Sequence, residues 1–392
     1  MRVLMVTREY PPASEGGISR RLANLVPMLM DKGVDVGVVS FGGMSLVGER
    51  TYFLDAQSPI LYTHSSEPSV THAASVLTDI WRLDEYASRI LSHESYDLVQ
   101  VEEPVFGPFI SSPVPKIVTT HTTQLGEFRA LLGVFNNARQ VTRLMFSGTV
   151  GWAFDRLCLR NADAVVAVGQ TIRTELRRFY GVPYEKVRVI PNGVNVPIEV
   201  KKAQAKKEIG VENFLFLYAG RLVDRKRVQD FLKALSMLKH RGFDSFSALV
   251  VGAGPSKENL ASLAHRLGLT DRLRFTGYVD DRLFFRFLEA ADVFVLPSCY
   301  EGHPISLIEA MAYGCVPVAA NIPQIREIIR TRQNGITYPV GDLESLTDAL
   351  FDVATDAGLR SSILSASRES AMDLSWSAAA SEYIKIYRAL VG

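Results

Sequence analysis

The stretch VFVLPSCYEGHPISLIEAMAYG, residues 293–314, contains an apolar run, a short loop and a helical segment in succession. Val293 to Leu296 is β-branched and aromatic and ends at a proline, which is typical of a strand buried in a parallel sheet. Pro304 suits the first position of a helix because it has no N–H to leave unpaired, and Gly314 suits the residue just past the end. The stretch therefore predicts a strand, a loop and a covering helix.

Two carboxylates accompany the start of this helix. Glu301 lies in the loop and Glu309 lies one turn into the helix. The amides of Ile305 and Ser306 would have no acceptor within the helix, and such amides together with the helix dipole favour a phosphate. We therefore expect two carboxylates and an anion-attracting helix end at one place. The alternative is that Glu301 is a solvated loop carboxylate and Glu309 only complements the dipole of its own first turn.

Short apolar runs alternate with helical segments along the rest of the chain. The runs are RVLMVT, VDVGVVS, DLVQVE, KIVTTH, AVVAVG and VRVIP, then after a break FLFLYAG, SALVVGAG, LRFTGYV, VFVLPS, VPVAAN and ITYPV. This alternation predicts right-handed βαβ units and parallel sheets. Because 392 residues are too many for one ordinary core, we expect two doubly wound α/β domains that face a central cleft.

A break between the two halves lies at PNGVNVPIEVKKAQAKKEIG, residues 191–210, where turn residues give way to a lysine-rich stretch. We expect a first domain over residues 1–193 and a second over residues 194–375. The final segment, residues 376–392, carries apolar residues at helical spacing. It predicts an amphipathic last helix.

Composition excludes several classes of protein. With 43 basic and 42 acidic residues, the chain has no overall field that would attract nucleic acid or an anionic membrane. Cys158, Cys299 and Cys315 are far apart and predict neither a disulfide framework nor a zinc site, so a reducing cytoplasm is the simplest setting. The N-terminus reads as a first strand and not as a signal peptide, and no stretch approaches the roughly 18 apolar residues that span a bilayer.

Ligands of open parallel sheets bind beyond the carboxyl ends of the strands, so residues just after strands are the candidates for a site. Gly16 and Gly17 follow the first strand and precede a helix, where glycines let backbone N–H groups approach a diphosphate. Most such glycine pairs are simple turns. His121 ends the run KIVTTH, where it can donate to a substrate hydroxyl or carbonyl, or serve as a hydrogen-bonded residue of the rim.

Two cations follow the first strand of the second half. Arg221 ends FLFLYAGR, and Lys226 comes at the start of the next helix. Together they would hold a phosphate and offset the charge that grows on a leaving group, although a run such as DRKR is also typical of a solvated face. The nearby VVGAGP, residues 250–255, lacks the third glycine of a dinucleotide fingerprint because Lys257 stands in its place. A nicotinamide cofactor is therefore not supported.

Taken together, these motifs make the chain resemble the retaining glycosyltransferases of family 4, which have the GT-B fold and transfer a sugar from a nucleotide donor. The resemblance extends over almost the whole chain. It rests on the Gly16-Gly17 loop, His121, ADAVVAVG, VRVIPNGV, AGRL with Lys226, VGAGP, FTGYV, ADVFVLPS, EGHPISLIEAMAYGCVPVAA and NGITYPVGD. The most specific feature is the pair of glutamates separated by seven residues and followed by EAMAYG.

The resemblance implies a role for each candidate residue. Glu309 would bind the ribose hydroxyls of the donor, and Glu301 would face the transferred sugar. Arg221 and Lys226 would grip the diphosphate, while His121 would touch a hydroxyl of the donor sugar. The catalytic set is then His121, Glu301, Arg221 and Lys226, and the donor-binding set is Gly16, Gly17, Arg221, Lys226, Glu301, Pro304, Ile305, Ser306 and Glu309.

The activity implied is retaining transfer of a sugar, from a UDP- or GDP-linked donor, to a hydroxyl of a glycan, a lipid-linked or a small-molecule acceptor. No metal or other cofactor is expected, and the last helix is expected to cross back onto the N-terminal domain. Two other classes stay open. One is another enzyme of the same fold, a nucleotide-sugar epimerase or a sugar phosphorylase, and the other is a non-catalytic nucleotide-sugar-binding protein.

Four positions depart from the usual wording of the family. His303 stands where an aromatic or apolar residue is common, and Arg227 replaces a common glycine after the lysine. Gly169 replaces a common serine, and Thr122 stands where an aspartate is frequent. None of the four removes a group expected to bind or react, but together they leave the donor sugar open.

The acceptor side is expected in the long apolar stretch after His121, residues 122–154, which includes Arg129, Arg139 and Arg143. Such a stretch can form helices that receive a lipid-linked acceptor at a membrane surface. In that case the protein would be cytoplasmic and peripheral at the inner face of the membrane. The alternative is an ordinary helical wall of the acceptor cleft.

Overall fold

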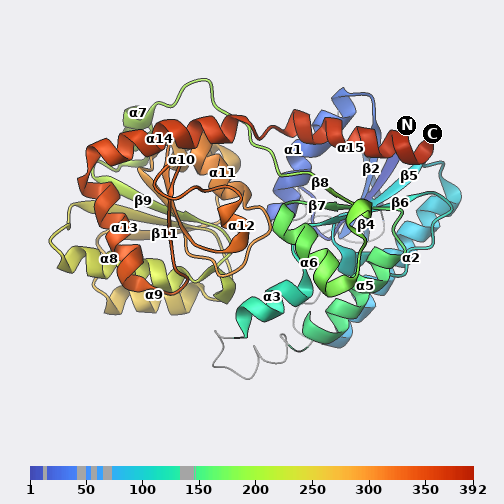
Figure 1. Ribbon diagram of the computed structural model, residues 1–392, viewed down its shortest axis with the longest axis horizontal. Helices are drawn as coiled ribbons and strands as arrows, with labels where there is room; N and C mark the ends of the chain where they lie inside the picture. The colour runs from blue at the N-terminus through green and yellow to red at the C-terminus, as the bar shows by residue number, and fades with distance from the viewer. Residues whose placement is uncertain (12–15, 42–49, 54–59, 65–72, 133–144, 146) are drawn as a thin grey trace. The chain divides into compact units, whose positions relative to one another are not determined.

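The structure is a computed structural model that describes residues 1–11, 16–41, 50–53, 60–64, 73–132, 145 and 147–392. The chain forms two compact units, one of residues 1–193 with 375–392 and the other of residues 194–374 (Figure 1). The second unit is thus inserted into the first. Its two ends lie together, because the amide of Val194 donates to the carbonyl of Leu374 at 2.9 Å.

An eight-stranded sheet forms the middle of the first unit, in the order β3-β4-β2-β1-β5-β6-β7-β8. All neighbouring strands are parallel except β3 and β4. The strands are β1 (Arg2–Val6), β2 (Asp35–Phe41), β3 (Arg50–Phe53), β4 (Ile60–His64), β5 (Leu98–Val101), β6 (Lys116–Thr120), β7 (Ala164–Ala167) and β8 (Val187–Val189). The strand order changes direction at β1 and β5, which places a ligand site at their carboxyl ends.

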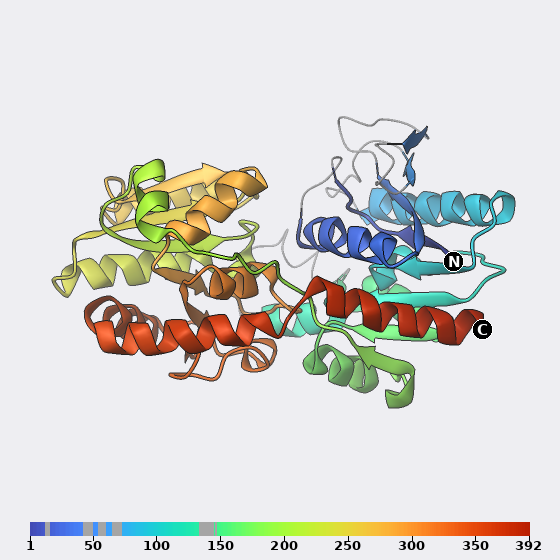
Figure 2. The ribbon, with the colours of Figure 1, turned by 90° about the horizontal axis from the view of Figure 1, so that it is seen from above.

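Helices pack on this sheet with their apolar stripes. They are α1 (Gly17–Asp31), α2 (Ala73–His93), α3 (Gln124–Leu131), α5 (Trp152–Arg160), α6 (Gln170–Tyr180) and α15 (Trp376–Val391). Side chains of α2, α5 and α6 join those of the strands in one core. The last helix, α15, lies beside α1, as the views in Figures 1 and 2 agree. Ser375 caps it by accepting a hydrogen bond from the amide of Ala378.

A six-stranded, fully parallel sheet forms the middle of the second unit, in the order β11-β10-β9-β12-β13-β14. The strands are β9 (Phe214–Ala219), β10 (Phe246–Val251), β11 (Leu273–Gly277), β12 (Val293–Leu296), β13 (Val316–Ala320) and β14 (Ile336–Tyr338). Counted from its own first strand, this is the order 3-2-1-4-5-6 of doubly wound nucleotide-binding sheets. The switch point lies between β9 and β12.

Both faces of the second sheet are covered. The helices are α7 (Lys202–Ile209), α8 (Val228–His240), α9 (Lys257–Arg266), α10 (Asp281–Ala290), α11 (Ile305–Ala312), α12 (Pro323–Arg326), α13 (Leu343–Thr355) and α14 (Ala357–Met372). Alternate residues of β9 explain the two cores: Phe216 and Tyr218 join α8 and α13 in one, whereas Leu215 and Leu217 join α10 and α11 in the other. Burial on both faces accounts for the unbroken apolar runs of the sequence.

The predicted α/β class with two doubly wound sheets is confirmed, and each of the twelve apolar runs contains a strand. Two strands, β3 and β4, were not predicted. One boundary was also misjudged: Pro304 has a ψ of 107°, so it precedes the helix as its cap and α11 begins at Ile305. The left-handed residue after the helix is Gly314, as expected, with φ at 79°.

Candidate functional site

Two loops meet at the switch point of the second unit. Strand β12 pairs with β9, so the loops that follow their carboxyl ends are neighbours. The amide of Cys299 donates to the carbonyl of Arg225 at 2.9 Å, and the Arg225 guanidinium donates to the carbonyl of Tyr300, also at 2.9 Å. Arg225 thus joins the loop after β9 to the loop after β12 and fixes the position of one loop relative to the other.

This junction brings the predicted Lys226 and Glu301 together. Lys226 Nζ donates to Glu301 Oε1 at 2.5 Å, and Arg225 Nη1 lies 3.7 Å from the other carboxylate oxygen. The side chains are 12% exposed for Lys226 and 6% for Glu301. We call Arg225, Lys226 and Glu301 the Lys226 centre. It is an ion cluster at the carboxyl edge of the sheet, where a diphosphate is expected to bind.

Burial governs the protonation of this centre. It lowers the pKa of Lys226 to about 8, against the pull of Glu301, and the positive charges of Arg225 and Arg221 add to the fall. Burial acts in the opposite sense on Glu301, but Lys226 and Arg225 outweigh it and hold the pKa of Glu301 below its ordinary value. At neutral pH the centre therefore contains a carboxylate and an ammonium group that loses its charge in mildly alkaline solution.

Arg221 is exposed and lies two residues after β9, and its loop contacts the loop after β10. The amide of Leu222 donates to the carbonyl of Ala253 at 2.8 Å. A Cβ on Gly254 would fall 2.4 Å from the carbonyl oxygen of Leu222, and the φ of Gly254 is 153°. The glycines of VVGAGP therefore allow two strand-end loops to touch through their backbones, which is a different use from binding a dinucleotide.

The remaining residues predicted to bind the sugar donor lie in helix α11 or just before it. Ile305 and Ser306 begin the helix, and their amides are among those that have no acceptor within it. Pro304 contributes only a carbonyl, which already accepts from the amides of Leu307 and Ile308. Glu309 is 4% exposed and lies one turn into the helix, as predicted. The four residues Arg221, Lys226, Glu301 and Glu309 thus belong to the same unit.

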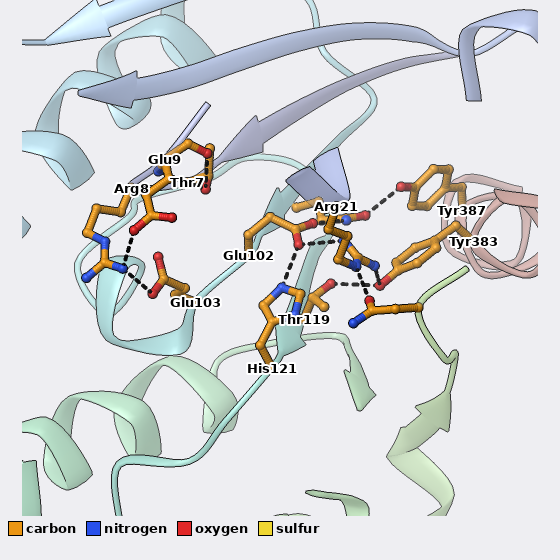
Figure 3. Close-up of polar contacts among 12 residues, drawn as sticks. Thr7, Arg8, Glu9, Arg21, Glu102, Glu103, Thr119, His121, Tyr383 and Tyr387 are labelled. Atoms are coloured by element: carbon orange, nitrogen blue, oxygen red, sulfur yellow. Dashed lines mark hydrogen bonds and ion pairs between the residues drawn. The ribbon is translucent and has the colours of Figure 1, made fainter. Parts of the chain in front are cut away.

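His121 belongs to the first unit, where it lies just after β6. Its Nε2 is 3.0 Å from Glu102 Oε2, and Glu102 follows the neighbouring strand β5 (Figure 3). On its other side Glu102 forms an ion pair with Arg21 of α1, with Nη1 2.8 Å from the same oxygen. We call Arg21, Glu102 and His121 the His121 centre. Its carboxylate and guanidinium are almost fully buried, with 0% and 1% of their surface exposed.

The charges of the His121 centre are set by its partners. Burial alone would raise the pKa of Glu102, but Arg21 and His121 outweigh it and the pKa falls to about 2. Burial lowers the pKa of His121, and the Arg21 charge acts in the same direction while Glu102 opposes it. At neutral pH we therefore expect an ionised Glu102 beside a neutral imidazole.

Gly16 and Gly17 lie at the start of α1 in the same unit. A Cβ on Gly16 would fall 2.0 Å from a carboxylate oxygen of Glu9, so this position is closely packed, whereas Gly17 has open space around it. Glu9 in turn pairs with Arg8 at 2.6 Å, and Figure 3 shows Arg8 between Glu9 and Glu103. The start of α1 thus already faces a carboxylate of its own chain.

The structure also bears on the expectations about metal binding, membrane spans and the acceptor side. Among the described residues, no group of three His, Cys, Asp or Glu side chains is placed to hold a metal ion. No helix within the described ranges combines the length and the apolar character needed to cross a bilayer. Of the arginines expected on the acceptor side, Arg129 lies in α3, whereas Arg139 and Arg143 fall outside the described residues.

Two family models match the chain, one after the other. The model described as Glycosyltransferase Family 4 matches residues 15–196, and the model described as Glycosyl transferases group 1 matches residues 199–370. The chain belongs to the GT-B glycosyltransferases of the family 4 type. The match to the second model includes every residue of the Lys226 centre, and the match to the first includes the His121 centre.

Individual proteins resemble the glycosyltransferase over its full length. An uncharacterized glycosyltransferase of Methanocaldococcus jannaschii is 25% identical, with 99% of this chain and 98% of that protein covered. The sucrose-phosphate synthase of Thermosynechococcus elongatus is 20% identical with a TM-score of 0.82, covering 99% and 98% of the two chains. A complex of Anabaena HepE with UDP-glucose is 18% identical with a TM-score of 0.75, and both chains are fully covered. The two solved structures support the GT-B fold.

Three residues of the glycosyltransferase's two centres were missed in the sequence. Glu102 follows a strand, so the rule that selected His121 would also have selected it. Arg21 lies on the stripe of α1 that includes Leu22 and Leu25, and a charge on a buried face signals a buried partner. Arg225 gave no signal, because nothing in the run DRKR separates it from the arginine two positions later.

Proposed function

We propose that the glycosyltransferase moves a sugar from a nucleotide-diphosphate sugar, UDP- or GDP-linked, to a hydroxyl of an acceptor, with retention of the anomeric configuration and without a metal. The acceptor is a glycan, a lipid-linked or a small molecule. The observation that carries the proposal is the Lys226 centre: two cations and a carboxylate, joined across the switch point of a doubly wound sheet.

The chemistry of donor cleavage fits this arrangement. As the sugar–phosphate bond breaks, the anomeric carbon becomes electron-poor and the diphosphate gains charge. Lys226 and Arg221 are proposed to stabilise that growing charge, since donors fixed in advance act most strongly where charge develops. Glu301 is proposed to orient Lys226 and to face the sugar, and Glu309 to bind the ribose hydroxyls. The start of α11 adds amides that favour a phosphate.

The first unit is proposed to complete the site. His121 would contact a hydroxyl of the donor sugar, and the backbone at Gly17 would cover the diphosphate. The cleft expected between the two units stays a prediction. HepE, which has the same fold, was solved with UDP-glucose, and this makes a UDP-linked sugar the first donor to test.

The acceptor is proposed to bind on the first unit. Helices α3 and α5 contact each other. Leu132, just after α3, is 61% exposed, and Leu157 of α5 is 39% exposed, while Arg129 and Arg156 lie on the same helices. Apolar and basic side chains together suit a lipid-linked acceptor at an anionic surface. Liposome flotation tests this part, and no binding to anionic lipid would exclude it while leaving a glycan acceptor.

The donor is tested by thermal unfolding in the presence of UDP-, GDP- and ADP-sugars. A ligand at a hundred times its Kd adds about 2.7 kcal/mol to stability, which is easily measured. We expect one nucleotide to stand out and its effect to be lost in Lys226→Ala. If no nucleotide sugar stabilises the protein, the proposal fails.

The product then separates the alternatives. Transfer to an added acceptor supports the proposal, and NMR of the new linkage reports whether the anomeric configuration is kept. Conversion of the donor sugar without any acceptor would identify an epimerase. Sugar release that requires inorganic phosphate would identify a phosphorylase. Binding without turnover on a broad acceptor panel would indicate a non-catalytic nucleotide-sugar-binding protein.

A further inference from the structure

Arg21 is the hub of a buried polar network that reaches the last helix of the chain. Beside its ion pair with Glu102, its Nε donates to Asn192 Oδ1 at 3.0 Å. Its Nη2 donates to the hydroxyl of Tyr383 at 2.7 Å (Figure 3). Because the Arg21 side chain is only 1% exposed, these protein partners take the place of water. The direction of its guanidinium therefore depends on α15, which carries Tyr383.

A second connection from α15 reaches the other oxygen of Glu102. Tyr387 donates to Gln100 Oε1 at 2.5 Å, and Gln100 Nε2 donates to Glu102 Oε1. Tyr383 and Tyr387 are one helical turn apart, and both are completely buried. The hydroxyl of Tyr383 also lies 3.0 Å from Oγ1 of Thr119, which is on β6, two residues before His121. The last helix thus braces both oxygens of Glu102 and the strand that leads to His121.

The contacts of Glu102 determine which face His121 presents. An ionised carboxylate only accepts hydrogen bonds, so the His121 nitrogen next to it, Nε2, must carry the hydrogen. In a neutral imidazole the other nitrogen, Nδ1, is then an acceptor. The charged groups that face His121 are Glu102, Arg21 and Glu9, and burial combined with Arg21 keeps its pKa below the ordinary value. The ring is therefore suited to accept a hydrogen bond from a hydroxyl.

We infer that Tyr383 and Tyr387 are positioning residues that act through Arg21, Gln100 and Glu102 to hold His121 with its hydrogen on Nε2. His121 then offers Nδ1 as a hydrogen-bond acceptor to a hydroxyl of the sugar. The inference about the sugar rests on the proposed function, whereas the state of the ring does not. A substrate group without a hydrogen to donate, such as a carbonyl oxygen or a methoxy group, would not be accepted at this place.

The state of the ring is measured by NMR on protein labelled with ¹⁵N-histidine, where the two ring nitrogens report the tautomer directly. His121→Gln identifies the signal among the seven histidines. We expect the wild type to show a neutral ring with the hydrogen on Nε2. In Tyr383→Phe/Tyr387→Phe, which keeps both aromatic rings and removes only their hydroxyls, we expect the signal to move toward a mixture of tautomers. Glu102→Gln should give the same change, because an amide can also donate.

A matched control removes a buried tyrosine hydroxyl elsewhere in the first unit. Tyr62→Phe breaks a contact of 3.1 Å between the hydroxyls of Tyr62 and Tyr96, and Tyr62 is 3% exposed. It should leave the His121 signal unchanged. An unchanged His121 signal in the double Phe variant would overturn the inference, whatever happens to its stability.

Kinetics provide the second readout. We expect kcat/KM of the double Phe variant to fall about ten- to a hundredfold, by analogy with the loss seen when outer partners that orient a metal-binding histidine are removed. A donor whose sugar hydroxyls are methylated one at a time should lose its dependence on His121 at a single position. If the NMR change occurs but no sugar transfer is found in the wild type, the positioning network stands and the proposed function fails.

Discussion

Glu102 and Glu301 are both buried carboxylates paired with cations, yet their surroundings differ. Arg21, the partner of Glu102, is 1% exposed and donates hydrogen bonds to a carboxylate, an amide oxygen and a phenol of the protein. Lys226, the partner of Glu301, is 12% exposed and carries three N–H donors, one of which goes to Glu301. The first pair is therefore closed off from solvent, whereas the second keeps some access to it.

The two centres also differ in how far apart their residues lie in the sequence. The Lys226 centre is assembled from two neighbouring strand-end loops of one sheet, so it needs only local structure. The His121 centre depends on Tyr383, which is 362 residues away from Arg21 in the sequence. The buried charges of the first unit thus contact one imidazole and are held by residues far apart in the sequence, whereas those of the second unit lie in two neighbouring loops and keep some exposure.

The largest expected difference between the two centres is in the stability that each loses when its cation is removed, beginning with Arg21→Met. It leaves Glu102 buried without its main cation, and breaking a buried pair in this way typically costs about 3–5 kcal/mol of unfolding free energy. Lys226→Met should cost less than Arg21→Met, because Arg225 stays beside Glu301 and its carboxylate keeps a cationic partner. Chemical denaturation, monitored by the hydrogen exchange of backbone amides in each unit, measures the loss of unfolding free energy for the two units separately. Equal losses in the two variants would contradict the comparison.

Lys226→Ala should have the opposite balance, with a large effect on rate and a small one on stability. Removing one donor that stabilises transition-state charge lowers kcat/KM about a hundred- to a thousandfold, roughly 3–4 kcal/mol. Lys239→Ala, at the far end of α8, is the control and should keep normal turnover. Steady-state kinetics with the best donor decide the matter, together with a circular dichroism spectrum like that of the wild type. Normal turnover by folded Lys226→Ala would remove Lys226 from the mechanism.

Activity should fall as the pH rises through about 8, because Lys226 loses its charge there. Glu301 is the group that raises the pKa of Lys226, so Glu301→Gln should move this alkaline limb to lower pH. Glu102→Gln, in the other centre, should leave the limb in place. The measurement is the pH dependence of kcat/KM for the three proteins. An alkaline limb that stays fixed in Glu301→Gln would show that another group controls it.

The smallest change sharpens the comparison by stabilising the first unit without touching either centre. Gly169 is the N-cap of α6, has extended backbone angles and makes no side-chain cap. A serine there can accept from a backbone amide of the first turn and should add a few tenths of a kcal/mol. Chemical denaturation of Gly169→Ser measures the gain, and kcat/KM should not change. Gly169→Ala provides the contrast, since alanine cannot cap.

Much of this architecture was predictable because buried parallel strands are recognisable as apolar runs, and their carboxyl ends identify His121, Lys226 and Glu301. Strands β3 and β4 were missed because they lie at one edge of their sheet. Side-chain partners across hundreds of residues, such as Arg21 with Tyr383, leave no periodic trace in a single sequence.

One departure from the family pattern became intelligible only in the structure. Arg227 has a φ of 50°, in the left-handed region, which explains why relatives commonly have glycine there. The chain keeps this arginine with an ion pair, since its Nε lies 2.6 Å from Asp230 in the first turn of α8. The conformational cost at this position was not readable from the residue alone.

The return of α15 to the first unit has a consequence for biosynthesis. A ribosome makes Arg21, Glu102 and the strands around them first, and it adds Tyr383 and Tyr387 only after the whole second unit. Until then Arg21 lacks its hydrogen bond to Tyr383, and the nascent first unit lacks helix α15, which covers α1. The first unit therefore cannot complete its fold until the whole second unit has been made, so the usual order of domain folding from the N-terminus does not apply to it.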